Sequence, residues 1–151
     1  MLVRAYRIRP ATAADQRAIR KLVRSAGINP IGLHWPPFKV AVSNDTIIGT
    51  VQVKPHRDGT RELASLAVVP QFQNSGIGAA LIQTVQAESQ PPLYLTCVDR
   101  LEGFYNRFHF RRVEPRALPP HLGRTYMFAN FLFGLTRQPF RLLVMRWGDR
   151  Q

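Results

Sequence analysis

The sequence predicts an α/β sandwich with a mixed sheet, and two observations carry that prediction. Segments that alternate like strands and segments with helical spacing follow one another along the 151 residues. A glycine-bearing turn, Gln73–Ala79, lies between an apolar strand-like run and an amphipathic helix-like run. The chain has no repeat, low-complexity tract or interdomain linker, so we expect a single domain over residues 1–151.

The first half of the chain predicts a strand, a helix and a hairpin. Residues 6–9 alternate as a short strand does. Thr12 is expected to cap a helix, with Asp15 three residues later completing a variant capping box. Glycines and prolines then make residues 27–37 a loop, and residues 38–53 are typical of a hairpin with a polar turn.

The second half predicts strands and helices in alternation around the glycine turn. In order, we expect a strand over residues 63–70, a helix from residue 77 to before residue 91, a strand over 93–98, a short helix over 101–107, and strands over 108–113 and 141–147. Three prolines make residues 115–123 irregular in this prediction.

The turn Gln73–Ala79 is predicted to bind an anion. Its glycines let the backbone approach a ligand, and the free N–H groups of the following helical turn point at that ligand. The Rossmann pattern is excluded because its third glycine would fall on position 81, which is Leu81. A Walker loop is excluded because this segment has no lysine.

The pattern that fits is Q/R-x-x-G-x-G/A, here Gln73, Gly76 and Gly78. With Leu66-Ala67-Val68-Val69-Pro70 before it and Ala80-Leu81-Ile82 after it, the segment resembles the acetyl-CoA-binding motif of the GCN5-related N-acetyltransferases (GNAT). The element order is similar to that family over nearly the whole chain. The resemblance implies a GNAT-type mixed, mostly antiparallel twisted sheet flanked by helices, with an inserted apolar segment before the last strand.

The resemblance also implies acetyl-CoA as co-substrate, and we expect no metal. In the family, the backbone of Leu66, Ala67 and Val68 would pair with the pantetheine arm like an added strand. The amides of the next segment would hold the pyrophosphate: Gln73, Asn74, Ser75, Gly76, Ile77, Gly78 and Ala79. The alternative is an ordinary strand–turn–helix whose glycines serve packing.

Two residues are candidates for the proton transfers of direct acetyl transfer to an amine. Phe104-Tyr105 followed by Phe110 resembles the family pattern in which a tyrosine protonates the leaving thiolate, which predicts Tyr105 as the general acid. Glu62 opens the strand before the motif, where family members place a carboxylate base; the alternative is a solvated charge at a strand end. His56 is the fallback base, and an exposed turn residue otherwise.

Two positions depart from the family pattern. His109 stands where the family prefers glycine, so we expect the turn after the short helix to be made differently. Val98 replaces an asparagine often found seven residues before the tyrosine, which puts one cofactor contact in doubt. His34 and Trp35 lie in the loop between the predicted first helix and second strand, which corresponds to the acceptor-binding loop of the family. We expect Trp35 to pack on the core.

Composition limits the class of protein. One cysteine excludes an internal disulfide, and we expect Cys97 to be a buried structural thiol. Met1 to Tyr6 lack the apolar core of a signal peptide, and no apolar run is long enough to span a membrane, so we expect a cytoplasmic protein. The net charge of +12 favours phosphate-rich partners, but the arginines are scattered, so nucleic acid remains a minor alternative.

The segment 115–138 resembles an insertion, because the family usually has only a short loop here. Within it, Tyr126–Leu135 is unusually apolar. We expect this stretch to pack on the sheet or to form a homodimer contact; a lid over an apolar acceptor pocket and a membrane-touching element beside Arg124 and Arg137 are the alternatives.

The sequence thus predicts an acetyl-CoA-dependent N-acetyltransferase acting on a primary amine of a small molecule or a protein. Two other classes stay open. One is a CoA-binding module without catalysis, used for sensing or assembly, which the departures at Val98 and His109 would suit. The other is a basic nucleic-acid-associated protein in which the glycine turn is incidental.

Overall fold

The computed structural model describes residues 5–137 and 139–148. The expectation about the first residues of the chain therefore falls partly outside the described residues, as does position 138 of the predicted insertion. The contacts divide the chain into two compact units. The first unit comprises the chain up to Lys54 together with Leu63–Ser89, and the second comprises Pro55–Glu62 and the chain from Gln90 on.

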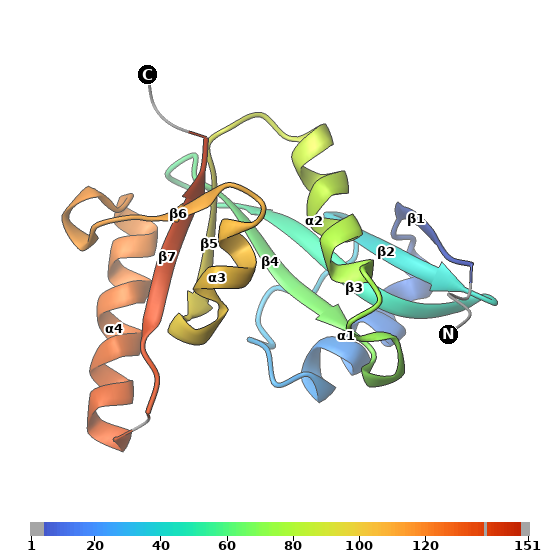
Figure 1. Ribbon diagram of the computed structural model, residues 1–151, viewed down its shortest axis with the longest axis horizontal. Helices are drawn as coiled ribbons and strands as arrows, with labels where there is room; N and C mark the ends of the chain where they lie inside the picture. The colour runs from blue at the N-terminus through green and yellow to red at the C-terminus, as the bar shows by residue number, and fades with distance from the viewer. Residues whose placement is uncertain (1–4, 138, 149–151) are drawn as a thin grey trace. The chain divides into compact units, whose positions relative to one another are not determined.

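The first unit is a four-stranded sheet with two helices (Figure 1). Its elements are β1 (Arg7–Pro10), η1 (Ala13–Asp15), α1 (Gln16–Ser25), β2 (Phe38–Ser43), β3 (Thr46–Pro55), β4 (Arg61–Val68), η2 (Pro70–Phe72) and α2 (Ile77–Glu88). The last residue of β3 and the first two of β4 are counted with the second unit. The strands follow the order β1-β2-β3-β4, and the first two pairs are antiparallel. These elements match the predicted strand, helix, hairpin, strand and helix.

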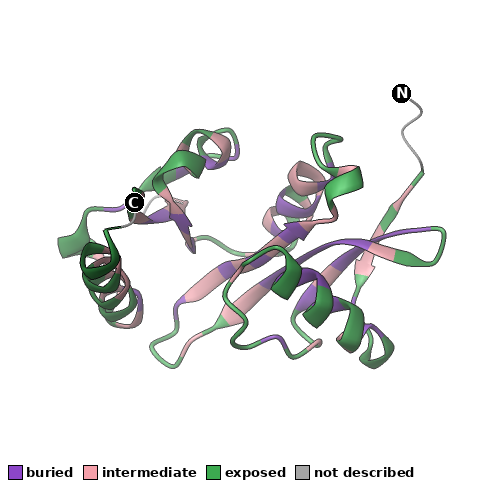
Figure 2. Ribbon diagram, turned by 90° about the horizontal axis from the view of Figure 1, so that it is seen from below, coloured by how far each residue is buried: buried purple, intermediate pink, exposed green. Residues whose placement is uncertain are grey.

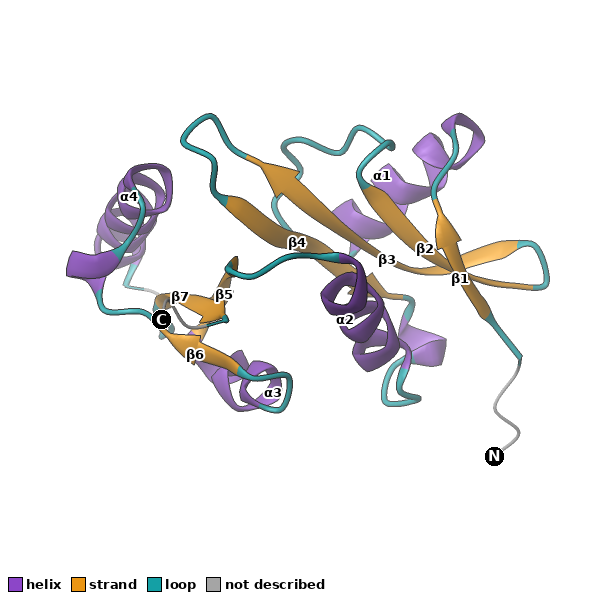
Figure 3. Cartoon of the chain, turned by 90° about the horizontal axis from the view of Figure 1, so that it is seen from above, coloured by secondary structure: helices purple, strands orange, loops and turns teal. Residues whose placement is uncertain are grey.

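The two helices cover opposite faces of this sheet, as Figure 3 shows. Phe38 and Val40 of β2 point to one face, where they join Ile19 and Val23 of α1 in a buried apolar cluster. Lys39 lies between them and points to the other face. There its ammonium is 2.6 Å from the carboxylate of Glu88 in α2. Because successive side chains of β2 point to opposite faces of the sheet, apolar residues meet α1 on one face and Lys39 meets α2 on the other.

The start of α2 approaches the sheet closely at Gly49. A Cβ at this position would lie 3.0 Å from Leu81 Cδ1, 3.1 Å from Ile77 Cγ2 and 3.4 Å from the Ala67 carbonyl oxygen. Gly49 therefore makes room in β3 for the first turns of α2, which carry the predicted anion-binding N–H groups.

The predicted cap at the start of the first helix is present. The Thr12 N–H donates to Asp15 Oδ2 at 2.7 Å. The same carboxylate accepts two hydrogen bonds from the Arg9 guanidinium, at 2.7 and 3.0 Å. The Arg9 hydrogen bond, assisted by those from Thr12, lowers the pKa of Asp15 to about 2. The pair joins β1 to the entrance of α1.

The second unit contains a three-stranded antiparallel sheet with two further helices. Its elements are β5 (Leu93–Val98), η3 (Asp99–Leu101), α3 (Glu102–Asn106), β6 (Phe110–Arg112), η4 (Pro115–Ala117), α4 (Pro120–Thr136) and β7 (Leu142–Trp147). The strand order is β5-β7-β6, so the last strand of the chain lies between the two that precede it. The α/β fold with helix-flanked strands is confirmed.

The helices of this unit again pack on different faces of the strands. Tyr94 of β5 and Val144 of β7 meet Leu122 of α4 in a buried cluster. Their strand neighbours face the other way. On that side Cys97 Sγ lies 3.8 Å from Met145 Sδ. Leu122 is the one buried residue of α4, and Figure 2 shows the rest of this helix as half-buried along one edge and exposed elsewhere.

One sequence prediction for this region is wrong. The prolines predict an irregular segment over residues 115–123, but α4 begins at Pro120. Proline is tolerated at the first position of a helix because its missing N–H would have no intrahelical partner there. The prolines therefore mark the start of a 17-residue helix. Among the described residues, no helix has both the length and the apolarity needed to cross a membrane.

Candidate active site

The glycine motif follows directly on a strand of the first unit. β4 ends at Val68, and the N–H of Val69 donates to the Ile48 carbonyl at 2.9 Å. The short helix Pro70–Phe72 then turns the chain toward α2. The turn Gln73–Ala79 therefore lies just beyond the carboxyl end of a strand, as the sequence predicts.

Gly76 adopts a backbone conformation that favours glycine. Its φ is 86° and its ψ is 2°, immediately before α2. A Cβ there would meet nothing within 4 Å, so the restriction comes from the backbone and not from crowding. The Ala80 N–H makes a 3.0 Å bond to the Gly76 carbonyl. The N–H groups of residues 77–79 have no acceptor within the helix, and these donors at the positive end of the helix dipole suit an anion.

Two side chains of the motif stabilise the turn by hydrogen bonds to its own backbone. Gln73 Nε2 donates to the Val68 carbonyl at 3.1 Å, across the base of the turn. The Ser75 hydroxyl donates to the Phe72 carbonyl. The backbone N–H of Gln73 also donates internally, to the Pro70 carbonyl at 3.3 Å. The glutamine of the motif thus holds the geometry that presents the later N–H groups.

Three buried polar residues were not singled out in the sequence analysis: Thr50, Gln52 and Ser65. They meet at an irregularity in β4 just before Leu66–Val68. Ser65 has a left-handed φ of 56°, which is rare for a residue inside a strand. Its carbonyl accepts a 3.0 Å bond from Thr50 Oγ1, and its hydroxyl accepts a 2.9 Å bond from Gln52 Nε2. Such an irregularity changes the direction of the strand backbone that follows it. The available sequence signal is three polar residues within otherwise apolar strand runs.

Gln52 leaves one strong acceptor without a partner. Its side chain is buried, and among the described residues nothing donates to Oε1. Buried polar atoms are nearly always paired, so this unpaired oxygen is an exception among the polar atoms beside β4.

The loop between α1 and β2 is held by side chains from other elements. Gln16 donates to the Leu33 carbonyl at 2.6 Å and accepts from the Trp35 N–H at 2.9 Å. Gln52 donates to the Gly32 carbonyl at 2.9 Å. Trp35 packs against the buried cluster of α1 and β2, as the sequence predicts, whereas His34 is exposed.

Tyr105 of α3 lies in the interior of the second unit. It is 8% exposed, and its ring makes edge contacts with Phe104 at 5.1 Å and with Phe110 at 6.1 Å between centroids. Burial, and to a lesser degree the nearby Cys97 sulfur, raise the pKa of the Tyr105 phenol. The phenol therefore keeps its proton over the whole physiological pH range.

Cys97 is a buried free cysteine, as predicted. Burial first, and then the charges of Glu102 and Asp99, raise its pKa to about 11. A thiol with this pKa carries almost no thiolate near neutral pH and is a poor nucleophile.

The two candidate bases touch each other. His56 Nε2 lies 2.7 Å from Glu62 Oε2, and the two side chains are only 14% and 16% exposed. The expectation of an exposed His56 is therefore wrong, and so is the alternative that Glu62 is merely a solvated charge at a strand end. The ring of His121, from the first turn of α4, stacks on His56 with 3.9 Å between centroids and 23° between planes. The His121 N–H donates to Asp58 Oδ2 at 3.1 Å, which joins α4 to the same turn.

The prediction that His109 changes the turn after α3 is wrong. His109 has a φ of 67°, the left-handed conformation in which glycine is favoured, and its N–H donates to the Asn106 carbonyl at 3.1 Å. The turn is therefore not made differently; histidine takes the glycine-like conformation. Val98 ends β5 and is half-buried.

The chain belongs to the GNAT family. A family model of the acetyltransferase (GNAT) domain matches residues 33–112, which include the hairpin, β4, the glycine turn and Tyr105. An uncharacterized N-acetyltransferase of Chlorobaculum tepidum is 25% identical over 130 residues, covering 78% of this chain and 83% of the relative. The described residues contain no group of three or more metal-ligating side chains placed to hold an ion.

Solved structures show the same fold. The N-acetylglutamate synthase of Neisseria gonorrhoeae, in complex with coenzyme A and N-acetyl-glutamate, has a TM-score of 0.74 at 20% identity over 96% of this chain. This chain spans only 36% of the synthase chain. Rv2747 of Mycobacterium tuberculosis, in complex with CoA and NLQ, has a TM-score of 0.71 at 18% identity, over 95% of this chain and 99% of the relative. At these identities the likeness concerns the fold.

Proposed function

We propose that this GNAT protein moves the acetyl group of acetyl-CoA directly to a primary amine of a small molecule or a protein. In this proposal residues 1–151 act as one acetyltransferase domain, and residues 115–138 are its insertion. One observation carries it: Gly76, at φ 86°, sits at the junction of β4 and α2 and opens a row of N–H donors just beyond a strand end. Family membership and two neighbours bound to CoA support the choice of cofactor.

The cofactor would lie along Leu66, Ala67 and Val68 and end at the turn. The irregularity at Ser65 precedes this stretch, which supports a strand whose backbone is turned toward a ligand. The pantetheine amides would pair with the backbone of Leu66–Val68. The pyrophosphate would accept hydrogen bonds from the segment Gln73–Ala79, chiefly from its last N–H groups, since the Gln73 N–H already has an internal acceptor.

Tyr105 is the proposed general acid. When the tetrahedral intermediate collapses, the C–S bond breaks and the thiolate of CoA takes a proton. A phenol at its ordinary pKa of about 10 is already protonated near neutral pH, and that proton is the one Tyr105 would donate. Burial raises the pKa of Tyr105 further, which keeps the proton in place but makes the phenol a weaker acid. Its aromatic neighbours hold the ring in one orientation, which a positioned acid requires.

Glu62 is the proposed general base, and it would work as a pair with His56. A carboxylate at its ordinary pKa is a weak base for an ammonium group, so a second group that relays the proton is useful. The 2.7 Å contact between the imidazole and the carboxylate supports such a relay. An imidazole has two ring nitrogens, so one can take up a proton while the other faces the carboxylate, which fixes the orientation of the ring.

Calorimetry with acetyl-CoA tests the cofactor site. Gly76→Trp forces a bulky side chain into the left-handed position where phosphate would bind, and we expect it to abolish binding. Gly27→Trp is the matched control, because Gly27 also has a positive φ, 69°, and a Cβ there would meet nothing within 4 Å, yet it lies outside the motif. Loss of binding in both variants, or in neither, would contradict the proposed site.

A screen of amine acceptors then tests catalysis. Turnover by the wild type that falls in Tyr105→Phe supports the transferase. CoA binding without turnover on any amine favours the non-catalytic module. A folded wild type that binds nucleic acid in a salt-dependent manner but no CoA favours the third class.

The apolar segment Tyr126–Leu135 is proposed as a homodimer contact. Met127, Phe128, Phe131 and Leu135 of α4 are 63–72% exposed, which makes a contiguous apolar stripe at helical spacing. Sedimentation velocity on Phe128→Glu and Phe131→Glu tests this proposal. We expect the wild type to dimerise and both variants to be monomers; a monomeric wild type at high salt, where the repulsion between +12 chains is screened, would refute it.

A further inference from the structure

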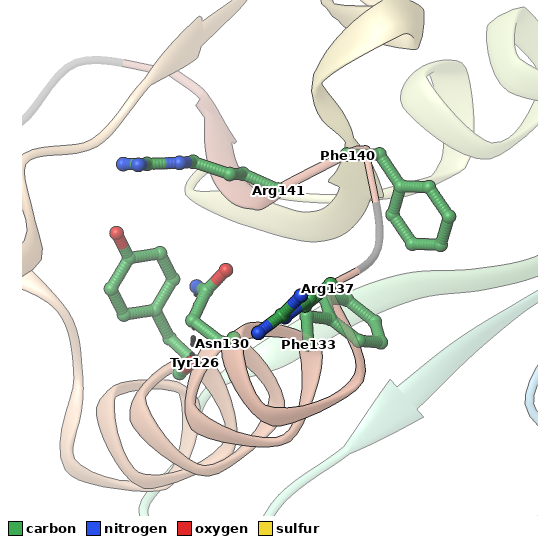
Figure 4. Close-up of a pocket in the computed structure, with 7 residues that line it drawn as sticks. Tyr126, Asn130, Phe133, Arg137, Phe140 and Arg141 are labelled. Carbon is green, nitrogen blue, oxygen red and sulfur yellow. Dashed lines mark hydrogen bonds between the residues drawn. The ribbon is translucent and has the colours of Figure 1, made fainter.

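The second unit contains a cavity that the acetyl-transfer chemistry does not use. It lies between the C-terminal half of α4 and the chain entering β7, and its volume is about 420 Å³. Volumes of this order suit small-molecule ligands. The lining side chains drawn in Figure 4 are Tyr126, Asn130, Phe133, Arg137, Phe140 and Arg141.

Among the described residues, the two arginines of the cavity form no ion pair, although Asp99 lies beside Arg141 on the neighbouring strand end. Residues 115–148 contain Arg116, Arg124, Arg137, Arg141 and Arg146, and no glutamate or aspartate. Within the part of the chain that the structure describes, neither Arg137 nor Arg141 has a carboxylate within ion-pair distance. An anion in the cavity would be attracted by both guanidinium groups.

The walls around these arginines are fixed by other contacts. Asn130 Oδ1 accepts from the Leu142 N–H at 3.1 Å, and its Nδ2 donates to the Leu142 carbonyl at 3.3 Å, so α4 is tied to the start of β7. Phe133 and Phe140 make an edge-to-face contact with 5.1 Å between centroids. The Arg141 carbonyl accepts the Asp99 N–H at 2.9 Å. The cavity is therefore held open by a satisfied amide and an aromatic pair.

We propose that this cavity binds a small organic oxyanion, a carboxylate or a phosphate, carried on an aromatic body. Arginine matches the two oxygens of such groups with a pair of parallel N–H bonds. The rings of Phe133 and Phe140 supply an apolar wall for the body of the ligand. Figure 4 shows Arg137 extending from α4 and Arg141 from the facing segment, so the oxyanion would lie between two elements.

The two arginines are not equivalent. Arg137 is the capping residue that follows α4, with a φ of 52°, and its own N–H donates to the Phe133 carbonyl. Its charge is partly offset by the negative end of the helix dipole. Arg141 lies in the segment before β7 and has no helix end of its own. We therefore expect Arg141 to contribute more to anion binding than Arg137.

Ligand-observed NMR titration of the full chain tests the proposal, with 3-phenylpropionate and phenyl phosphate as probes and the neutral 3-phenylpropanamide as control. We expect millimolar or tighter binding of at least one oxyanion and at least tenfold weaker binding of the amide. The preferred probe identifies the oxyanion. Arg141→Gln should weaken binding about tenfold, and Arg137→Gln should weaken it less. Arg124→Gln, on the same helix but outside the cavity, should leave it unchanged.

The test is independent of folding defects and of the cofactor site. The amide comparison uses the wild type alone, and thermal unfolding verifies each variant. Oxyanion binding should persist in Gly76→Trp, so the proposal for the cavity would stand even if the acetyl-CoA proposal failed. Equal affinity for oxyanion and amide, or binding unchanged in Arg141→Gln, would overturn the proposal.

Discussion

The turn Gln73–Ala79 and the Arg137–Arg141 cavity present positive charge in opposite ways. The turn uses backbone N–H groups of consecutive residues, exposed because a helix begins there and Gly76 takes a left-handed conformation. The cavity uses side chains from a helix and from a facing segment, with aromatic rings as walls. A backbone site is sensitive to the shape of a few residues, whereas a side-chain site is sensitive to the identity of each one.

The candidates for proton transfer, like the cavity, depend on side chains brought together from different elements. His56 and Glu62 flank the turn between β3 and β4, and His121 lies in α4, so their contacts depend on how these segments meet. Tyr105 depends on the aromatic packing of α3 and β6. If this distinction holds, substitutions in the second unit should change catalysis and leave cofactor affinity intact, and substitutions around α2 should do the reverse.

The largest effect is expected for Tyr105→Phe. Removing the phenol oxygen removes the acid but keeps the ring packing, so kcat should fall about 100-fold or more. The dissociation constant for acetyl-CoA should not change. Tyr94→Phe is the matched control, since Tyr94 is a buried tyrosine in the same unit. A kcat that survives in Tyr105→Phe would remove this residue from the mechanism.

The His56–Glu62 pair should behave as one functional unit. Glu62→Gln and His56→Gln should each lower kcat about tenfold or more, and the double variant should be no worse than the poorer single one. Glutamine at 56 retains an amide donor for Glu62 but cannot accept a proton. Steady-state kinetics on the four proteins measures the coupling. Strictly additive losses would mean that the two residues act separately, and a normal rate in His56→Gln would leave Glu62 as the base alone.

Gly49→Ala tests the close contact between β3 and the first turns of α2. The new Cβ would meet Leu81 and Ile77 at 3.0–3.1 Å, so we expect a loss of about 1 kcal/mol in the free energy of unfolding. Acetyl-CoA affinity should also weaken, because α2 must shift. Gly103→Ala is the counterpart in α3, where a Cβ meets nothing within 4 Å and alanine favours the helix. Urea denaturation should show opposite signs for the two; the same sign would refute the close approach of α2.

His109→Gly should have the smallest effect. Histidine at φ 67° is strained by about 1–2 kcal/mol relative to an unstrained backbone, and glycine relieves this strain. The greater freedom of glycine in the unfolded chain offsets about 0.5–1 kcal/mol of that gain. Thermal unfolding should therefore show a net stabilisation between zero and about 1.5 kcal/mol, with unchanged kcat. A destabilised variant would mean that the His109 side chain makes a contact that matters more than its backbone strain.

Much of the fold is predictable because its elements are locally encoded. Alternation marks the hairpin of β2 and β3, four-residue spacing marks α2, and Gly76 marks the turn between strand and helix. The prediction fails where local signals conflict: the prolines around Pro120 indicate an irregular segment, yet one of them opens α4. The prediction for His109 fails for a similar reason, since residue identity suggests, but does not decide, whether a left-handed conformation is taken.

The strand–turn–helix around Gln73–Ala79, and with it the family, can be read from the sequence alone, because these features depend on the backbone preferences of neighbouring residues. Three other features come from tertiary packing: His56 and Glu62 form a pair under His121, Ser65 interrupts β4, and Arg137 and Arg141 line one cavity. Such contacts join residues from different elements. Their distances are set by the packing of helices on strands, which no short stretch of sequence specifies.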